Sequence, residues 1–166
     1  MKSIRQAAME DIPIIRDLAY IIWPEAYGTI LSPEQLRYML DRFYSIPSLE
    51  IQIKDFHHHF LLVLNKNKPV GFASFSPKQP DMNIIRLHKI YVLPQEQGSG
   101  TGKFLLQNVI EGAKQLGGRK LELNVNRNNK ARFFYEKQGF FITGEEDIDI
   151  GKGYFMNDYI MELGLC

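Results

Sequence analysis

Cysteine is almost absent from this sequence: the only one is Cys166, the last of 166 residues. A lone cysteine at the chain end excludes an internal disulfide framework and a zinc site built on several thiolates, and it does not favour a cysteine nucleophile. An excess of one charge is also lacking, because twenty Lys and Arg residues balance nineteen Asp and Glu, for a formal net charge of +1. The chain therefore lacks the overall positive charge that non-specific nucleic-acid binding uses, and we expect no nucleic-acid partner.

Long apolar runs are missing as well. Lys2, Arg5 and Glu10 interrupt the N-terminus where a secretory signal would need an apolar segment, and a proline and charged residues interrupt the stretch 12–23. We therefore expect a cytoplasmic protein with no membrane partner. With 45% hydrophobic and 23% charged residues, the composition is that of a globular protein, and the length predicts a single domain over 1–166.

Hydrophobic periodicity predicts an order of strands and helices that combines hairpins with one strand–helix–strand crossover. Strands are predicted at 3–7, 60–64, 69–76, 84–92, 120–125, 140–143 and 154–163. Helices are predicted at 9–22, 33–43, 102–116 and 128–138, with a loop at 23–31. This order favours one mixed sheet covered by helices.

The segment 84–103 places a strand directly before a glycine-rich turn and the start of a helix. Gly98, Gly100 and Gly102 allow backbone N–H groups to converge on one point, where the positive end of the helix dipole also lies. This arrangement suits a phosphate or pyrophosphate group. A glycine-rich turn that binds nothing is the alternative.

The spacing of the turn separates three classes of phosphate ligand. A dinucleotide fingerprint would need glycine at position 103, where Lys103 stands. A nucleoside-triphosphate loop would need glycine at position 97 and a hydroxyl at position 104, where Gln97 and Phe104 stand. The pattern Gln-x-x-Gly-x-Gly is met by Gln97, Gly100 and Gly102.

A second block, Asn-x-x-Ala-x-x-Phe-Tyr-Glu-Lys-x-Gly-Phe, runs from 128 to 140. With these two blocks the sequence resembles the GCN5-related N-acetyltransferase superfamily, and weaker similarity extends over nearly the whole chain. The resemblance implies transfer of an acetyl group from acetyl-CoA to an amine by direct attack, with no metal. It also implies an α+β (mixed α/β) acyl-CoA N-acyltransferase fold, with a central, mostly antiparallel twisted sheet of about seven strands and helices on both faces.

The resemblance assigns acetyl-CoA to three segments of the chain. Backbone groups of the strand before the turn would bind the pantetheine arm, the amides of the turn would bind the pyrophosphate, and Asn128 would contact the pantetheine arm again. The residues so implied for the cosubstrate are Ile90, Tyr91, Val92, Gln97, Gly98, Ser99, Gly100, Thr101, Gly102, Lys103, Asn128, Ala131 and Tyr135.

Two proton transfers are expected in this chemistry. Tyr135 matches the tyrosine beside the leaving sulfur, and a phenol with a pKa of about 10 is protonated at neutral pH, so we expect it to be the general acid. Packing in an aromatic cluster is its alternative role. A base is also expected, because an alkyl ammonium with a pKa of about 10.4 is almost fully protonated at pH 7. Many relatives have a glutamate on the strand before the turn, but this sequence has Arg86 there, which leaves His88, Glu25 or a water as the base.

The acceptor is expected between the first two helices, where the resemblance implies roles for Trp23, Glu25 and Tyr27. Ordinary packing or solvation is the alternative for each of them. We expect a small-molecule primary amine, with polyamines as one example. The alternatives are a protein N-terminus or lysine, or a noncatalytic module that senses acyl-CoA. A homodimer is one assembly that the resemblance allows.

The run His57-His58-His59 invites interpretation as a metal site. No cysteine or suitably spaced acidic residue accompanies it. We therefore interpret it as the polar entrance to a strand and expect no metal site.

Overall fold

The seven strands of the protein form one sheet in the computed structural model, which describes residues 1–165. The strands are β1 (Lys2–Gln6), β2 (His59–Asn65), β3 (Lys68–Pro77), β4 (Ile84–Val92), β5 (Lys120–Asn126), β6 (Phe141–Gly151) and β7 (Tyr154–Gly164). Their order is β1-β2-β3-β4-β5-β7-β6, and only the pair β4 and β5 is parallel. The predicted mostly antiparallel sheet of about seven strands is confirmed.

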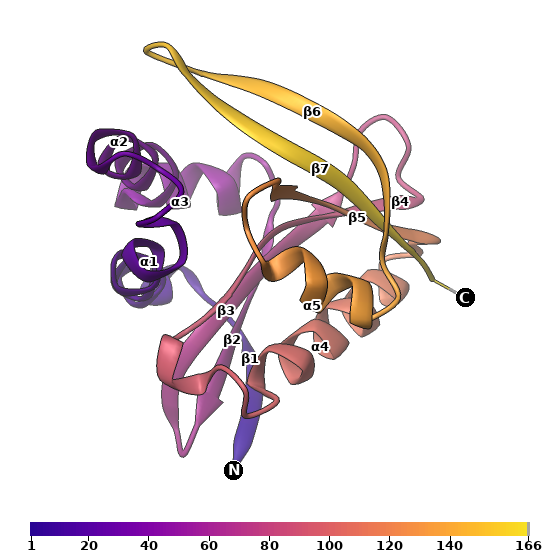
Figure 1. The fold of residues 1–166 in the computed structure, drawn as a ribbon. Coiled ribbons are helices and arrows are strands. Elements are labelled where there is room, and N and C mark those ends of the chain that lie inside the picture. The colour runs from indigo at the N-terminus through magenta and orange to yellow at the C-terminus, as the bar shows by residue number, and fades with distance from the viewer. Residues whose placement is uncertain (166) are drawn as a thin grey trace.

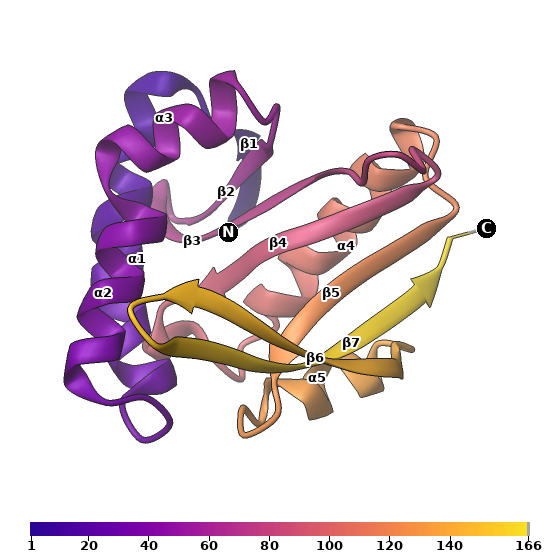
Figure 2. The same cartoon turned by 90° about the horizontal axis from the view of Figure 1, so that it is seen from above.

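Helices cover both faces of this sheet, as predicted (Figure 1). They are α1 (Ile12–Tyr27), α2 (Pro33–Tyr44), α3 (Ile46–Lys54), α4 (Thr101–Gln115) and α5 (Ala131–Lys137), with short 3-10 turns η1 (Met9–Asp11) and η2 (Pro94–Glu96). Helices α1, α2 and α3 gather on one side of the sheet, and α4 and α5 lie on the other (Figures 1 and 2). None of the helices within residues 1–165 is long and apolar enough to cross a membrane.

The core fills the two layers between the sheet and its helices. Apolar residues at helical spacing turn one stripe of α1 and one stripe of α4 inward, and each fully buried Leu, Ile or Phe side chain contributes about 1.5–3 kcal/mol of transfer free energy. The central strands supply the matching apolar side chains. Among the fully or almost fully buried residues are Ile12, Ile15, Ala19, Leu62, Phe72, Ile85, Leu105, Leu106, Val109 and Leu121.

Three local predictions are corrected by the structure. The predicted loop at 23–31 is largely helix, because α1 continues through Pro24 to Tyr27 and thereby buries Ile22 and Trp23 in the core. Helix α3 was not predicted; Ser45 begins it by accepting a hydrogen bond from the backbone N–H of Ser48 at 3.3 Å. The predicted strand at 140–143 extends to Gly151, because β6 pairs with β7 along its whole length.

Candidate active site

The two central parallel strands separate at the middle of the sheet. Strands β4 and β5 pair only from Ile84 to Leu87 on β4, opposite 120–123 on β5. Beyond Leu87 they diverge (Figure 2), so the β4 backbone groups that face β5 there lose their strand partner. Ile90 and Val92, predicted to bind the pantetheine arm through their backbone, lie in this divergent stretch.

A bulge at His88 changes which β4 side chains lie on the face of the sheet that α1, α2 and α3 cover. Ser74 on β3 is opposite Lys89, and the next residue, Phe75, is opposite Leu87, so His88 is the extra residue. The alternation of faces is therefore shifted beyond this point. As a result, Lys89 and Tyr91 join Arg86 in lining the same cavity.

The glycine turn has the geometry expected of an anion site. Gly98 and Gly100 have φ values of 82° and 84°, which a residue with a side chain rarely adopts. Gly100 lies directly before α4, whose first-turn amides lack helical acceptors. The amide of Gln97 instead donates to the carbonyl of Pro94 at 3.2 Å, so it is already engaged in holding the turn.

The underside of the turn is held by one carboxylate, that of Glu96. Its Oε1 accepts hydrogen bonds from Asn65 at 3.2 Å and from the Thr101 hydroxyl at 3.0 Å. Thr101 is fully buried, so its side chain serves the turn rather than a ligand. The ammonium of Lys2 reaches the carbonyl of Ser99 at 2.5 Å and brings a positive charge to the rim of the turn, which the sequence analysis did not predict.

The second predicted cosubstrate segment begins with a turn. Helix α5 starts at Ala131, and the backbone N–H of Asn128 donates to the side chain of Asn126 at 2.9 Å. The Asn128 side chain is exposed to solvent. Tyr135 is 9% exposed, and its ring packs edge-on against Phe140 at 5.7 Å between centroids. Burial raises the pKa of the Tyr135 phenol, so the phenol stays protonated at neutral pH.

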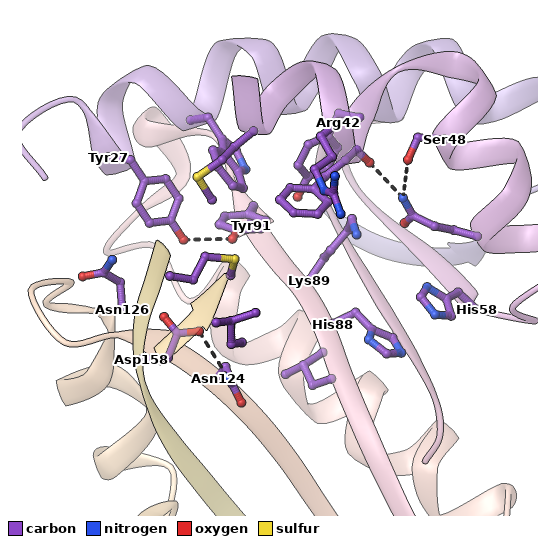
Figure 3. A pocket seen from close by; sticks show the side chains of 18 of the residues that line it. Tyr27, Arg42, Ser48, His58, His88, Lys89, Tyr91, Asn124, Asn126 and Asp158 are labelled. Carbon is purple, nitrogen blue, oxygen red and sulfur yellow. Dashed lines mark hydrogen bonds between the residues drawn. The ribbon is translucent and has the colours of Figure 1, made fainter. Parts of the chain in front are cut away.

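A cavity of about 680 Å³ lies on the opposite side of the divergent strands from α4 and α5 (Figure 3). Its walls come from α1, α2, α3, β4, β5 and the hairpin β6–β7. Apolar and aromatic side chains make up a little more than half of the lining, and polar and charged side chains make up the rest. The lining includes Trp23, Tyr27, Met39, Arg42, Phe43, Tyr44, Arg86, His88, Lys89, Tyr91, Met156 and Asp158.

Trp23 and Tyr27 line this cavity, whereas Glu25 does not. The rings of Trp23 and Tyr27 lie 4.6 Å apart, and the hydroxyl groups of Tyr27 and Tyr91 are hydrogen-bonded at 2.9 Å. The Tyr91 side chain therefore forms part of the cavity wall together with Tyr27. Glu25 is an exposed residue of α1 rather than part of a loop. The structure thus does not bring Glu25 to the site.

The hairpin β6–β7 closes one end of the cavity. The hydroxyl of Tyr38 on α2 donates to the carbonyl of Ile150 at 2.6 Å, and the Gln35 side chain donates to the carbonyl of Phe155 at 3.2 Å. These bonds hold the hairpin tip against α2 (Figure 2). The cavity is consequently a roofed chamber at this end rather than an open groove.

His88 is held by two neighbours. Its Nε2 is hydrogen-bonded to the hydroxyl of Ser76 at 2.7 Å, and its ring stacks on His58 at 3.8 Å between centroids. Burial, followed by the nearby His58, Lys89 and Arg86, lowers the pKa of His88 to about 2. Burial and Lys89 lower the pKa of His58 to about 4. Both imidazoles are therefore neutral at pH 7, and His88 is a weak proton acceptor.

We expect this histidine stack to make the protein acid-sensitive. Between pH 6.5 and about 4 the unfolded histidines bind protons and the folded ones do not, so the free energy of unfolding falls as pH falls. The free energy of unfolding should change by about 1.4 kcal/mol per pH unit for each histidine. Urea unfolding at pH 7, 6 and 5 measures this slope. His58→Phe keeps the stacked ring without titrating, so its slope should be smaller; equal slopes would contradict the interpretation.

Asp158, Lys89 and Arg42 were not predicted, and they are the charged groups of the cavity besides Arg86. Asp158 is 2% exposed and accepts a hydrogen bond from Asn124 at 3.2 Å. Burial raises the pKa of this carboxyl group above its ordinary value. Only the strand register could have identified Asp158 and Lys89, since it brings β7 beside β5 and shifts Lys89 past the bulge. Arg42 reaches the cavity from α2.

Known proteins are similar to this chain in sequence and in overall fold. The PaiA N-acetyltransferase from Thermoplasma acidophilum, solved in complex with coenzyme A, superimposes with a TM-score of 0.81, at 27% identity over 99% of both chains. An N-acetyltransferase from Mycobacterium tuberculosis is 28% identical over 92% of this chain and 97% of its own. The ribosomal protein bS18-alanine N-acetyltransferase from Haemophilus influenzae is 38% identical, over 57% of this chain and 60% of its own.

The sequence model of the Acetyltransferase (GNAT) family matches residues 15–140. This range holds most of α1, the divergent strands, the glycine turn and Tyr135. The chain belongs to the GNAT family and is an acetyl-CoA-dependent N-acetyltransferase.

Proposed function

We propose that this enzyme acetylates the primary amine of a small molecule. The observation that carries the proposal is the chamber of about 680 Å³, which is roofed where the hairpin β6–β7 is bonded to α2. A chamber of this size matches small-molecule sites, whereas an extended peptide needs an open groove. A polyamine is not favoured, because Arg42, Arg86 and Lys89 line the chamber against the single carboxylate of Asp158.

A protein amine is the second candidate, and the relatives favour it. The Haemophilus influenzae relative is named for the alanine of a ribosomal protein, and a relative from Escherichia coli, 31% identical over 97 residues, is named as a peptidyl-lysine N-acetyltransferase. The chain spans 60% and 58% of these proteins, respectively. A peptide acceptor would have to enter with the hairpin tip displaced from α2.

On the cosubstrate side, the free amides of the glycine turn would bind the pyrophosphate. These are the amides of Gly98, Gly100, Gly102 and Lys103, with Lys2 adding positive charge at the rim. The turn fits such a group, because a Cβ on Gly98 would meet only open space. The unpaired backbone of β4 at Ile90 and Val92 would bind the pantetheine arm.

In the transfer step, the neutral amine forms a bond to the acetyl carbon and the bond from that carbon to sulfur breaks. One proton leaves the nitrogen, and one proton reaches the departing sulfur. Tyr135 would supply the proton to sulfur, since its phenol is buried and protonated. Tyr135 does not itself line the cavity, but its phenol is close enough to that of Tyr27, which does, for the two to interact electrostatically; this supports a position of Tyr135 near the point where the two substrates would meet.

For the proton on nitrogen, Asp158 is the proposed acceptor. It is the only carboxylate among the described residues that line the cavity, and burial strengthens it as a base. His88 is a weaker candidate because its pKa is about 2, and Glu25 lies outside the cavity. Asp158 would also attract the acceptor in its ammonium form before that proton is lost.

We predict that Tyr135→Phe lowers kcat at least tenfold and leaves the Kd for acetyl-CoA within threefold. Phenylalanine keeps the packing against Phe140 and removes only the phenol O–H. If this O–H is the general acid, its loss lowers kcat. Steady-state kinetics and calorimetry measure the two quantities. Phe133→Leu, which changes an exposed neighbouring ring, is the control. An unchanged kcat in Tyr135→Phe would remove it as the acid.

The proposed function is tested by following free CoA thiol with acetyl-CoA and a panel of amines. The panel holds amino acids, aralkyl amines, polyamines and short peptides with a free N-terminus or lysine. Turnover of a small amine with kcat/KM at least tenfold above that of every peptide supports the proposal. Turnover of peptides alone would replace it with the protein acceptor.

A further inference from the structure

The chamber contains two cations without a carboxylate partner. Arg86 is neutralised, because its guanidinium lies 2.6 Å from the carboxylate of Glu122. For Lys89 and Arg42, no carboxylate lies within 4.0 Å in the part of the chain that the structure describes. Since Glu122 belongs to β5 and is already bound to two cations, it offers no further neutralisation.

These two cations are held at the same wall. The Lys89 ammonium lies 5.2 Å from the ring centre of Tyr44 on α2. The Arg42 guanidinium lies 5.7 Å from the ring centre of Phe43, which stands between Arg42 and Tyr44 on the same helix. In Figure 3 both side chains extend toward each other beneath α2. Lys89 is half-buried, and loss of hydration lowers its pKa to about 8, so it still carries its charge at pH 7.

A half-buried cation of this kind is incompletely solvated and gains most from an anion that enters with a ligand. Arginine adds a planar pair of donors suited to a carboxylate. The carboxylate of Asp158 lies away from them, beside Asn124 and Asn126 (Figure 3). The chamber therefore has a negative group on β7, beside β5, and a positive wall where Lys89 of β4 lies beneath α2.

Much of the uncharged lining of the chamber is apolar. It includes Met39, Phe43, Tyr91 and Met156. A ligand that matches this pattern has an ammonium group, an apolar body and an acidic group. Resting on the proposed small-molecule function, we propose that the acceptor is an amino acid-like amine whose carboxylate binds Lys89 and Arg42.

The test compares acceptors that differ only in the acidic group. Phenylalanine, its amide and phenethylamine share the amine and the aromatic body, and the series is repeated with methionine and tryptophan. For at least one series, we expect the carboxylate to have kcat/KM at least tenfold above the amide and the decarboxylated amine. A wild-type enzyme that acetylates acids and amides with equal kcat/KM in every series would overturn the subsite.

Variants locate the preference in the cavity. Lys89→Met and Arg42→Gln should each raise KM for the carboxylate at least tenfold, change KM for the amide less than threefold and leave kcat within threefold. Lys68→Met, on the exposed start of β3, is the matched control and should change neither. Equal effects of Lys89→Met on acid and amide would also overturn the proposal.

Calorimetry with CoA-saturated protein separates this proposal from the proposed function. Carboxylate ligands should bind at least tenfold tighter than their amides, and Lys89→Met should abolish the difference. Absence of turnover with every amine, together with this binding preference, would contradict the proposed function and support the subsite. Turnover of a small amine without a binding preference for carboxylates would support the proposed function and contradict the subsite.

Discussion

Replacing Gly100 with glutamate is expected to abolish the binding of CoA. Gly100 has a φ of 84° and precedes α4 directly, where the free amides of the turn meet the positive end of the helix dipole. A carboxylate at this position would meet the pyrophosphate at close range. We expect the Kd of CoA, measured by calorimetry, to rise by about 10³-fold, since a repulsive charge replaces a favourable field.

Two variants separate the charge from the strain of a side chain at positive φ. Gly117→Glu has the same φ problem, at 83°, with open space around the new side chain, but lies at the other end of α4. It should cost similar stability and leave CoA affinity unchanged. Gly100→Ala adds a Cβ whose nearest neighbour is the Lys2 ammonium at 3.9 Å, and should weaken binding less than tenfold. Unchanged affinity in Gly100→Glu would show that the turn does not bind the phosphates.

Much of the fold could be predicted because its elements carry their own signals. Strand β4 was predicted with its observed bounds, Ile84–Val92, because isoleucine, leucine, tyrosine and valine recur along it and Leu93-Pro94 follows. The first helix was predicted to end at Ile22, with a loop from 23 to 31. In the structure the helix continues past Pro24, where Trp23 packs against Tyr44 on α2 and Tyr91 on β4, so tertiary contacts override local propensity.

The glycine turn and the chamber differ in how much of each could be predicted from the sequence. The residues predicted to bind the pyrophosphate are consecutive, from Gln97 to Lys103, so their spacing alone forms a recognisable pattern. The acceptor chamber is built from seven helices and strands. Its charged residues have no common motif, and the bulge at His88 brings Lys89 into the cavity against simple alternation. Such a register shift follows from sheet packing and has no local sequence signal.

We expect Asp158→Asn to lower kcat by about 10²-fold at neutral pH, within the range that general bases contribute. Asparagine has the same shape and still accepts the hydrogen bond from Asn124, but cannot take a proton from the amine. The wild-type rate should fall on the acid side as Asp158 is protonated, at a pH above the ordinary aspartate range. In the variant, this acid limb of the kcat profile should disappear.

The stability of the variant distinguishes a chemical role from a structural one. Because burial raises the pKa of Asp158 in the folded state, the folded protein binds this proton more readily than the unfolded chain, and the ionised form lowers stability at neutral pH. Asp158→Asn should therefore unfold at the same or a higher temperature than wild type, and bind CoA equally. Asp17→Asn, an exposed aspartate of α1, should change neither kcat nor the profile. If Asp158→Asn kept the wild-type kcat, the amine proton would have to leave through His88 or water. A slow variant with intact stability and CoA affinity would identify Asp158 on β7 as the base.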